Sequence, residues 1–338
     1  MSADPADLRA RLTVPVVAAP MLTVSGPDMV VAACRSGVIG AFPTANCRSA
    51  AELDEWLTRI EAELGDDAAR LAPFCPNLIV HKSNPRLEQD LEVLLRHRIE
   101  LVITSVGSPE AVTGALHAAG ARVWCDVASL RHADRAIALG VDGLVLLTAG
   151  AGGQTGRMNP FAFVRAVRDR FGGIIVLAGG LADGRSLWAA EVLGCDLGYM
   201  GTRFIATTES MAPPDYKAMV REAELDDVLL TKAFTGLETN MLVGSIAAAG
   251  LDPRSLPEPE AFEMQKTLLG GTEGPRRWRD IWSAGHSVSG VDEILPVAEL
   301  VGRLREEYVE ARAETTARLG ATSGPSGSPR PDPGAARA

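Results

Sequence analysis

Short runs of aliphatic and β-branched residues alternate with longer segments of helical periodicity from about residue 14 to residue 206. This rhythm is typical of parallel βαβ units, in which a helix follows each strand. The pattern predicts eight strands: Val14–Ala18, Val38–Phe42, Phe74–Ile79, Leu101–Thr104, Val123–Val127, Gly143–Leu147, Ile174–Leu177 and Leu197–Met200. An open doubly wound sheet would show the same alternation. Eight units with glycine-rich turns after the last two strands favour a (β/α)8 TIM barrel of the α/β class.

The alternation stops after the eighth predicted strand. Residues 207–280 are polar and rich in proline, with helical patches and no clear strand, so we expect a helical subdomain or lid appended after strand eight. A final helix should pack against the body of the protein, because an apolar stripe recurs along it at helical spacing. The residues of that stripe are Val297, Leu300, Val301, Leu304 and Tyr308.

These patterns divide the chain into three parts. We expect a barrel domain made of residues 1–206 and about 281–317, with the helical subdomain of residues 207–280 between them. Residues 318–338 form the third part, and from Gly320 onward they offer nothing larger than Ala for a core. Such a composition is typical of a disordered tail.

Charge and composition exclude several classes of function. The chain has 338 residues and a formal net charge of −10, with Lys and Arg scattered along it, so nucleic acid is not an expected partner. No apolar run approaches the roughly 20 residues of a membrane span. The first residues also lack the layout of a secretory signal, which predicts a cytoplasmic protein without membrane contact. The five cysteines have no CxxC pair and no His cluster, so neither a disulfide framework nor a metal site is expected.

Three glycine-rich turns each follow a predicted strand directly, at residues 149–156, 178–181 and 200–202. Backbone without Cβ atoms can approach a ligand closely and direct N–H groups at anionic oxygens. In a barrel, the turns after strands seven and eight frequently form a phosphate site. We therefore expect Gly179, Gly180, Gly201 and the hydroxyl of Thr202 to hold a phosphate. The alternative is that these glycines only make tight turns between strand and helix.

The first predicted strand leads directly into Ala19, Pro20 and Met21. A methionine at the barrel mouth places a polarizable side chain where it could pack against a planar ring. A Met beside a Pro more often belongs to a core, but here the expected phosphate site lies across the same rim. The two features together predict a mononucleotide pocket.

Several segments resemble the FMN-dependent nitronate monooxygenases, formerly called 2-nitropropane dioxygenases, whose relatives include flavin-dependent enoyl-acyl carrier protein reductases. The resemblance covers nearly the whole chain, beginning with the AAPM segment at 18–21. It is carried by NLIVHKSNPRL (77–87), AGAGGQTG (149–156), LAGGLADGRSLWAAEVLGCDLGYMGTRFIATTES (177–210) and WRDIWSAGHSV (278–288). The AGG and MGTRF portions are the most specific.

This resemblance implies a flavoenzyme whose FMN contacts carry over residue by residue. The contacts implied for the isoalloxazine ring and ribityl chain are Met21, Asn77, Gly152 and Gly153. The implied phosphate ligands are Gly179, Gly180, Gly201 and Thr202, and Asp126 would lie by the polar edge of the flavin. The remaining implied contacts are Ala19, Pro20, Gln154, Gly156, Ala178 and Met200.

The sequence departs from the family pattern at Gln154, where members that oxidise nitronates typically place a histidine. Glutamine cannot act as a general base, although it can hydrogen-bond an anionic nitro or carbonyl group. The resemblance returns the late AGH segment to the active-site mouth, so we expect His286 to take over the polar or proton-transfer role while Gln154 orients the substrate. His81, in the loop after the third strand, is a further catalytic candidate. Structural roles remain open for both histidines, as part of a packed buttress for His286 and a loop hydrogen bond for His81.

The resemblance implies non-covalent FMN, no metal, and oxidation of a small anionic carbon acid such as an alkyl nitronate with O2. One alternative keeps FMN but reverses the electron flow, with NAD(P)H reducing the flavin and an enoyl thioester or quinone reoxidising it. Another alternative is a flavin-binding protein with little redox turnover. The sequence leaves the oligomeric state open, with a homodimer as one option.

Overall fold

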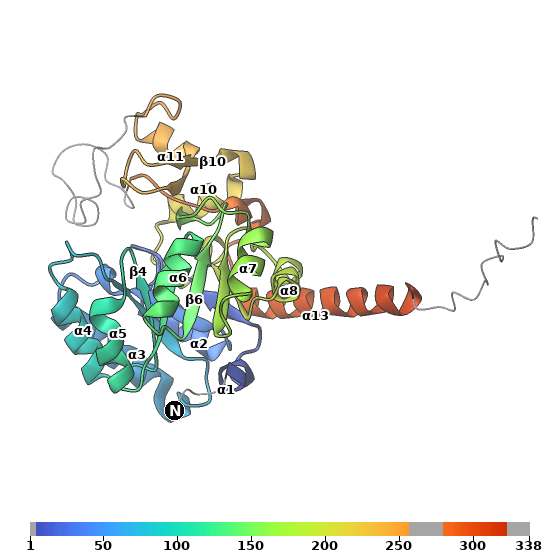
Figure 1. Cartoon of the computed structure of the whole chain (residues 1–338). Helices are drawn as coiled ribbons and strands as arrows, with labels where there is room; N and C mark the ends of the chain where they lie inside the picture. The colour runs from blue at the N-terminus through green and yellow to red at the C-terminus, as the bar shows by residue number, and fades with distance from the viewer. Residues whose placement is uncertain (1–4, 257–279, 323–338) are drawn as a thin grey trace, which may run out of the picture.

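Eight parallel strands close into a barrel in the order β1-β2-β3-β4-β5-β6-β8-β9, and helices surround it (Figure 1). The computed structural model describes residues 5–256 and 280–322. The barrel strands are β1 (Val16–Ala18), β2 (Ile39–Pro43), β3 (Phe74–Ile79), β4 (Leu101–Ser105), β5 (Arg122–Val127), β6 (Gly143–Leu147), β8 (Ile174–Ala178) and β9 (Leu197–Met200). All eight coincide closely with the strands that the sequence predicts. The predicted (β/α)8 barrel is confirmed.

The helices alternate with these strands and cover the outside of the barrel. They are α2 (Pro27–Arg35), α3 (Ala50–Leu64), α4 (Leu87–Arg96), α5 (Glu110–Ala118), α6 (Leu130–Ala138), α7 (Pro160–Arg168) and α8 (Gly184–Leu193), preceded by α1 (Pro5–Ala10). Side-chain caps fix where several of them begin. Ser129, for example, accepts a hydrogen bond from the backbone N–H of His132 at the start of α6.

The barrel interior changes from apolar to polar toward the carboxyl ends of the strands. Side chains such as Cys75, Ile103 and Trp124 fill the interior. Because side chains alternate along a strand with a period of two, the residues two positions further on point the same way. Those residues are Asn77, Ser105 and Asp126. The barrel therefore ends in a polar floor at its carboxyl-terminal mouth.

A small antiparallel sheet stands over this mouth. It consists of β10 (Val228–Thr231), β11 (Thr239–Leu242) and β7 (Gly153–Gln154), in the order β10-β11-β7. The prediction that residues 207–280 contain no strands is therefore wrong. These strands have only two to four residues, too few for a periodic signal, and pairing with β7 from the barrel loop stabilises them. Helices α10 (Pro214–Glu222) and α11 (Val243–Ala248) supply the expected helical part, and the short helix α9 (Thr202–Ile205) precedes it. Residues 257–279 lie outside the described ranges.

The long helix α13 (Val297–Thr322) packs against α8 and α2, with contacts to α8 that reach Thr315, and its last turns extend away from the barrel (Figure 1). All five residues of the predicted apolar stripe are buried, which confirms that part of the prediction. The helix continues to Thr322, into the segment predicted as a disordered tail from residue 318. Good helix formers such as Ala317 and Leu319 explain the extension. Residues 323–338 lie outside the described part of the chain.

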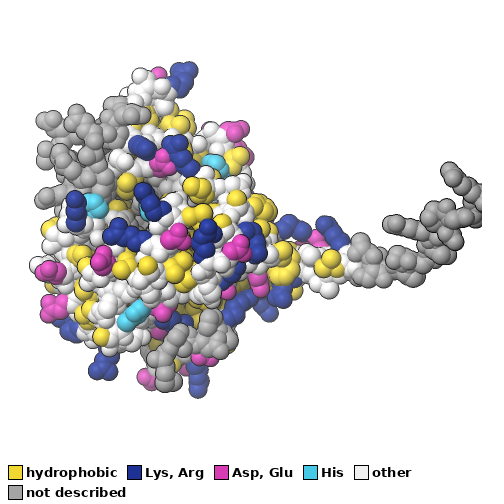
Figure 2. All heavy atoms as spheres, in the orientation of Figure 1, with side chains coloured by type: hydrophobic (Ala, Val, Ile, Leu, Met, Phe, Trp, Pro, Cys, Tyr) yellow, Lys and Arg dark blue, Asp and Glu magenta, His cyan; other side chains and the backbone are white. Residues whose placement is uncertain are grey.

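Basic and acidic side chains are interspersed on the face of the molecule shown in Figure 2. None of the helices in the described ranges is long and apolar enough to cross a membrane. All five cysteines are free and buried. Within residues 5–256 and 280–322, no group of three or more His, Cys, Asp or Glu side chains is placed to hold a metal ion.

Candidate active site

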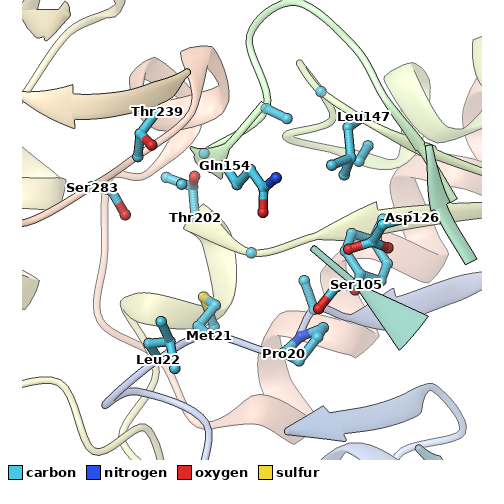
Figure 3. A pocket seen from close by; sticks show the side chains of 18 of the residues that line it. Pro20, Met21, Leu22, Ser105, Asp126, Leu147, Gln154, Thr202, Thr239 and Ser283 are labelled. Atoms are coloured by element: carbon cyan, nitrogen blue, oxygen red, sulfur yellow. The ribbon is translucent and has the colours of Figure 1, made fainter. Parts of the chain in front are cut away.

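A cavity lies at the carboxyl-terminal mouth of the barrel, beneath the small antiparallel sheet (Figure 3). Every barrel strand contributes a residue at or near its carboxyl end: Ala19, Pro43, Asn77, Ser105, Asp126, Leu147, Ala178 and Tyr199. The subdomain and the segment before α13 contribute Thr235, Leu237, Thr239, Ser283, Ala284 and Ser287. Active sites of (β/α)8 enzymes occupy this end of the barrel, so the cavity is the candidate active site.

The cavity brings together most of the residues predicted from the sequence. The predicted cofactor contacts that line it are Ala19, Pro20, Met21, Asn77, Asp126, Gly152, Gly153, Gln154, Ala178, Gly179, Gly180, Gly201 and Thr202. Gly156 and Met200 are absent from the lining. A Cβ atom at Gly156 would lie 2.2 Å from the carbonyl oxygen of Leu147, and Met200 is buried in the hydrophobic core around the barrel. Both residues therefore pack against the turns on the side away from the cavity.

The glycine-rich turns pack closely against one another. Gly179 has a φ of +128°, and a Cβ atom there would lie 2.4 Å from Thr148 Oγ1. A Cβ atom at Gly152 would lie 2.7 Å from the backbone nitrogen of Gly285. That same nitrogen donates a hydrogen bond of 2.9 Å to Thr202 Oγ1. The Thr202 hydroxyl keeps its own hydrogen for donation to a ligand.

Gln154 occupies a position fixed by the subdomain. It lies on β7, opposite Thr239 of β11, and its side chain is directed into the cavity (Figure 3). On one side of it, Asn240 Nδ2 donates a hydrogen bond of 2.7 Å to the carbonyl oxygen of Ala151. On the other side, the N–H of Thr155 donates to the carbonyl oxygen of Glu238 at 3.0 Å. The backbone around Gln154 is therefore held from both sides.

The two histidine candidates lie outside the cavity lining. The backbone N–H of His286 donates to the carbonyl oxygen of Gly150 at 2.9 Å, which brings the AGH segment to the mouth as expected. The side chain of His286 is exposed, and its ring lies against Gly150. In the loop after β3, His81 Nδ1 lies 2.6 Å from Ser83 Oγ. Of the three predicted catalytic residues, the structure places only Gln154 in the cavity.

The floor of the cavity carries two ionisable groups, Asp126 on β5 and Tyr199 on β9. Burial raises the pKa of Asp126 to about 8. Burial, together with the nearby carboxyl of Asp126, raises the pKa of Tyr199 well above its usual value. Both groups are therefore neutral at pH 7. Among the described lining residues there is no Lys, Arg or His, so the cavity wall carries no full positive charge.

Sequence reasoning missed several polar lining residues, notably Tyr199, Thr235, Thr239 and Ser283. Tyr199 had a usable signal, because it lies two residues before Gly201 in a strand that leads into a glycine turn, where an inward residue faces the mouth. Ser283 also had one, because it directly precedes the AGH segment that the resemblance places at the active-site mouth. Thr235 and Thr239 lie in an irregular segment and a short strand, whose sequences carry no comparable signal.

The sequence also matches a family over most of its length. The sequence model described as "Nitronate monooxygenase" fits residues 50–307. The chain belongs to the nitronate monooxygenase family. This confirms the resemblance seen in the sequence, and it makes the protein an enzyme of a flavin-dependent oxidoreductase family that acts on small molecules.

The relatives of this chain have different named activities. The chain is 26% identical to a nitronate monooxygenase of Paraburkholderia phytofirmans, over 88% of this chain and 93% of the relative. It is 28% identical to a substituted indene-carboxyl-CoA dehydrogenase of Rhodococcus jostii, over 68% of this chain and 62% of the relative. The solved structure of nitroalkane oxidase from Streptomyces ansochromogenes has a TM-score of 0.75 and 23% identity, over 91% of this chain and 99% of that one, and supports the fold.

The lining residues fit the flavin expected for a nitronate monooxygenase family member. Met21 lies against Gly201, because β1 and β9 are neighbouring strands and a Cβ atom at Gly201 would lie 3.3 Å from the sulfur of Met21. Met21 is therefore beside this part of the expected phosphate site, and the expectation that the two lie across the rim from each other is wrong. In the turn after β8, nothing lies within 4 Å of the Cβ position of Gly180, so the backbone there is open to the close approach that a phosphate requires. Asp126 supplies a buried oxygen without a partner among the described residues, as the polar edge of a ring requires.

Proposed function

We propose that this enzyme uses FMN to oxidise preformed alkyl nitronates with O2. The observation that best supports this is the fixed position of Gln154 in the cavity, in a chain of the nitronate monooxygenase family. A nitronate arrives without the carbon-bound proton, so the reaction needs no general base. The amide of Gln154 can donate hydrogen bonds to the nitro oxygens of such an anion.

The cofactor is proposed to span the barrel mouth. Gly179, Gly180, Gly201 and Thr202 would hold the FMN phosphate through backbone N–H groups and a hydroxyl. Met21 and the turn at Gly152 and Gly153 would contact the ring, and Asn77 and Asp126 would contact its polar edge. Bound FMN would supply the electron transfer from the nitronate to O2. In the balanced reaction, two nitronate anions and one O2 give two carbonyl products and two nitrite ions.

The protein would bind the substrate, orient it and shield it from solvent water. The hydroxyl of Ser283 lies on the subdomain side of the cavity, where it can hydrogen-bond the substrate. The neighbouring hydroxyl of Thr239 instead bonds Thr235 Oγ1 at 2.8 Å and shapes this wall. The small sheet above the mouth limits the access of water, which strengthens these polar interactions. His81 and His286 are left outside this arrangement, because neither lines the cavity.

A second candidate is a reductase in which NAD(P)H reduces FMN and an enoyl thioester or quinone reoxidises it. The uncharged wall of the cavity favours it, because the described lining offers no cation to pair with a nitronate. A neutral enoyl or quinone carbonyl needs only hydrogen-bond donors. Gln154 and the hydroxyls of the lining provide such donors.

Anaerobic reduction of the FMN-loaded protein separates these candidates. We expect propyl nitronate to bleach the flavin absorbance and NADPH to leave it unchanged, with nitrite release and O2 uptake when air is admitted. Reduction by NADPH and not by nitronate would establish the second candidate instead. A protein that fails to bind FMN after reconstitution would overturn both.

A further inference from the structure

Two polar atoms on the floor of the cavity are buried without partners. They are Asp126 Oδ1 and Tyr199 Oη, and neither has a hydrogen-bond partner among the described residues. Both residues line the cavity from the barrel side, at the carboxyl ends of β5 and β9. Folded proteins rarely leave buried polar atoms unsatisfied, and a bound ligand is one of the usual reasons for an exception.

The surroundings of this pair offer no compensating charge. The titratable groups that face it are the thiols of Cys75 on β3 and Cys125 on β5. Burial raises the pKa of Cys125 to about 12 and that of Cys75 well above its usual value, so both thiols stay neutral in the neutral and mildly alkaline range. The other polar residues of the floor satisfy each other, since Ser105 Oγ donates to Asn77 Oδ1 at 3.1 Å. An ionised Asp126 would find no cation among the described lining residues.

The position of the pair indicates which part of a ligand it meets. Asp126 and Ser105 lie on the opposite side of the cavity in Figure 3 from Thr239 and Ser283, which belong to the subdomain side. A mononucleotide whose phosphate lies at the turns after β8 and β9 must extend its ring over the barrel floor. The pair would therefore meet the cofactor ring, and the subdomain side would meet the substrate.

We propose that Asp126 and Tyr199 form a neutral, proton-bearing pair that binds the pyrimidine edge of the FMN ring by donating hydrogen bonds to its oxygen and nitrogen acceptors. The inference rests on the proposed function in taking FMN as the ligand. A protonated carboxyl donates through its O–H, as does a phenol, and both lose this ability when they ionise. Neutral donors at this edge would also stabilise the negative charge that the ring gains on reduction.

The pair makes FMN binding depend on pH in a defined direction. Burial raises the pKa of Asp126 to about 8, so the carboxyl is mostly protonated at pH 7 and mostly ionised at pH 9. If only the protonated form binds FMN, the apparent Kd increases as the protonated fraction falls. The expected increase between pH 7 and pH 9 is about tenfold.

The test measures the Kd of FMN by fluorescence quenching from pH 7 to pH 9. Wild type should show the tenfold weakening, and Asp126→Asn should bind like wild type at pH 7 without weakening at pH 9, because its amide donates at every pH. Tyr199→Phe should bind about two- to tenfold more weakly throughout, as expected for the loss of one hydrogen bond. Asp134→Asn, at an exposed position on α6, is the matched control and should follow wild type. In the protein without flavin, infrared spectra should show a protonated-carboxyl band that Asp126→Asn removes.

The outcomes distinguish this inference from the proposed function. A wild-type Kd that stays constant up to pH 9, or an equal weakening in Asp126→Asn, would overturn the assignment to Asp126 and leave FMN as the cofactor. Absence of the carboxyl band at pH 7 would also overturn it, whatever the FMN affinity. Failure to bind FMN at any pH would overturn both the proposed function and the inference.

Discussion

Gln154 and Thr239 are directly opposite each other across the β7–β11 ladder, so a strand of the subdomain fixes the backbone of the residue that stands in place of the expected histidine. The hydrogen bonds of Asn240 to Ala151 and of Thr155 to Glu238 hold the flanking backbone. Because the backbone is held on both sides, a substitution at residue 154 changes the chemistry of the cavity more than its shape. Residue 154 is therefore the most informative position for mutagenesis.

Replacing Gln154 by His should extend the reaction to neutral nitroalkanes. A positioned general base typically contributes about 100-fold or more to proton abstraction. We expect the kcat/KM for a neutral nitroalkane to increase by about that factor, with a pH dependence near the ordinary pKa of histidine, about 6.5. The kcat/KM for the preformed nitronate should change little. Steady-state nitrite release with each substrate measures both quantities.

Gln154→Leu is the matched control, because it keeps the side-chain volume and removes the amide. It should weaken nitronate turnover without creating activity on the neutral substrate. If Gln154→His left neutral nitroalkanes unreactive while remaining folded and FMN-bound, residue 154 would not face the reacting carbon.

His286→Ala and His81→Ala should leave nitronate kcat close to wild type. The His286 side chain is exposed against Gly150, and neither residue lines the cavity. Measurement of kcat for the two variants tests the roles assigned from the sequence. Loss of kcat in either one, with FMN affinity retained, would restore that histidine as a catalytic group.

Asn240→Ala should loosen the turn that carries Gln154. The side-chain amide is buried and donates to the buried carbonyl of Ala151, and an unsatisfied buried group costs about 1–3 kcal/mol. We expect the free energy of unfolding to fall by that amount and the KM for nitronate to increase. Urea denaturation and steady-state kinetics provide the two measurements. Leu230→Ala on the exposed part of β10 serves as the control and should change neither quantity appreciably.

Gly179→Ala should impair FMN binding and stability together. Gly179 has a φ of +128°, and the added Cβ atom would lie 2.4 Å from Thr148 Oγ1, so strain of about 1–3 kcal/mol is expected. Gly172→Ala is the matched control, because nothing lies within 4 Å of its Cβ position. Thermal unfolding and FMN titration of both variants test the prediction. Equal behaviour of the two would show that the turn after β8 tolerates a side chain and does not shape the phosphate site.

The barrel was predictable because its strands are buried on both faces. Parallel strands of this kind read as continuous aliphatic runs, and β6 and β8 are buried along their whole length. The strands of the small sheet could not be predicted in this way. The residues of β10 are half-buried or exposed, and β7 exists only because β11 pairs with it. Their formation depends on tertiary contacts, which a local pattern does not encode.

The residues of the candidate site also fall into two groups, those with a local sequence signal and those placed by contacts distant in the chain. Gly179, Gly180 and Gly201 were predictable from glycine-rich turns, because a turn that requires backbone without Cβ atoms shows this requirement in its own sequence. The placement of Gln154 inside the cavity and of His286 outside it depends on how the segment before α13 packs against the turn at Gly150. Contacts between segments so distant in the chain cannot be predicted from the local sequence of either segment.

Asp126 should also make the stability of the flavin-free protein depend on pH. In the unfolded chain its pKa returns to about 4, whereas in the folded protein burial raises the pKa to about 8. Between these values the folded state holds a proton that the unfolded state has lost, so the free energy of unfolding decreases as the pH rises, by about 1.4 kcal/mol per pH unit. Asp126→Asn lacks this proton. Its stability relative to wild type should therefore increase at that slope from pH 5 to pH 7 and level off above pH 8. Urea denaturation at pH 5, 6 and 7 measures the slope, and a constant difference between the two proteins would show that Asp126 is ionised in the folded state.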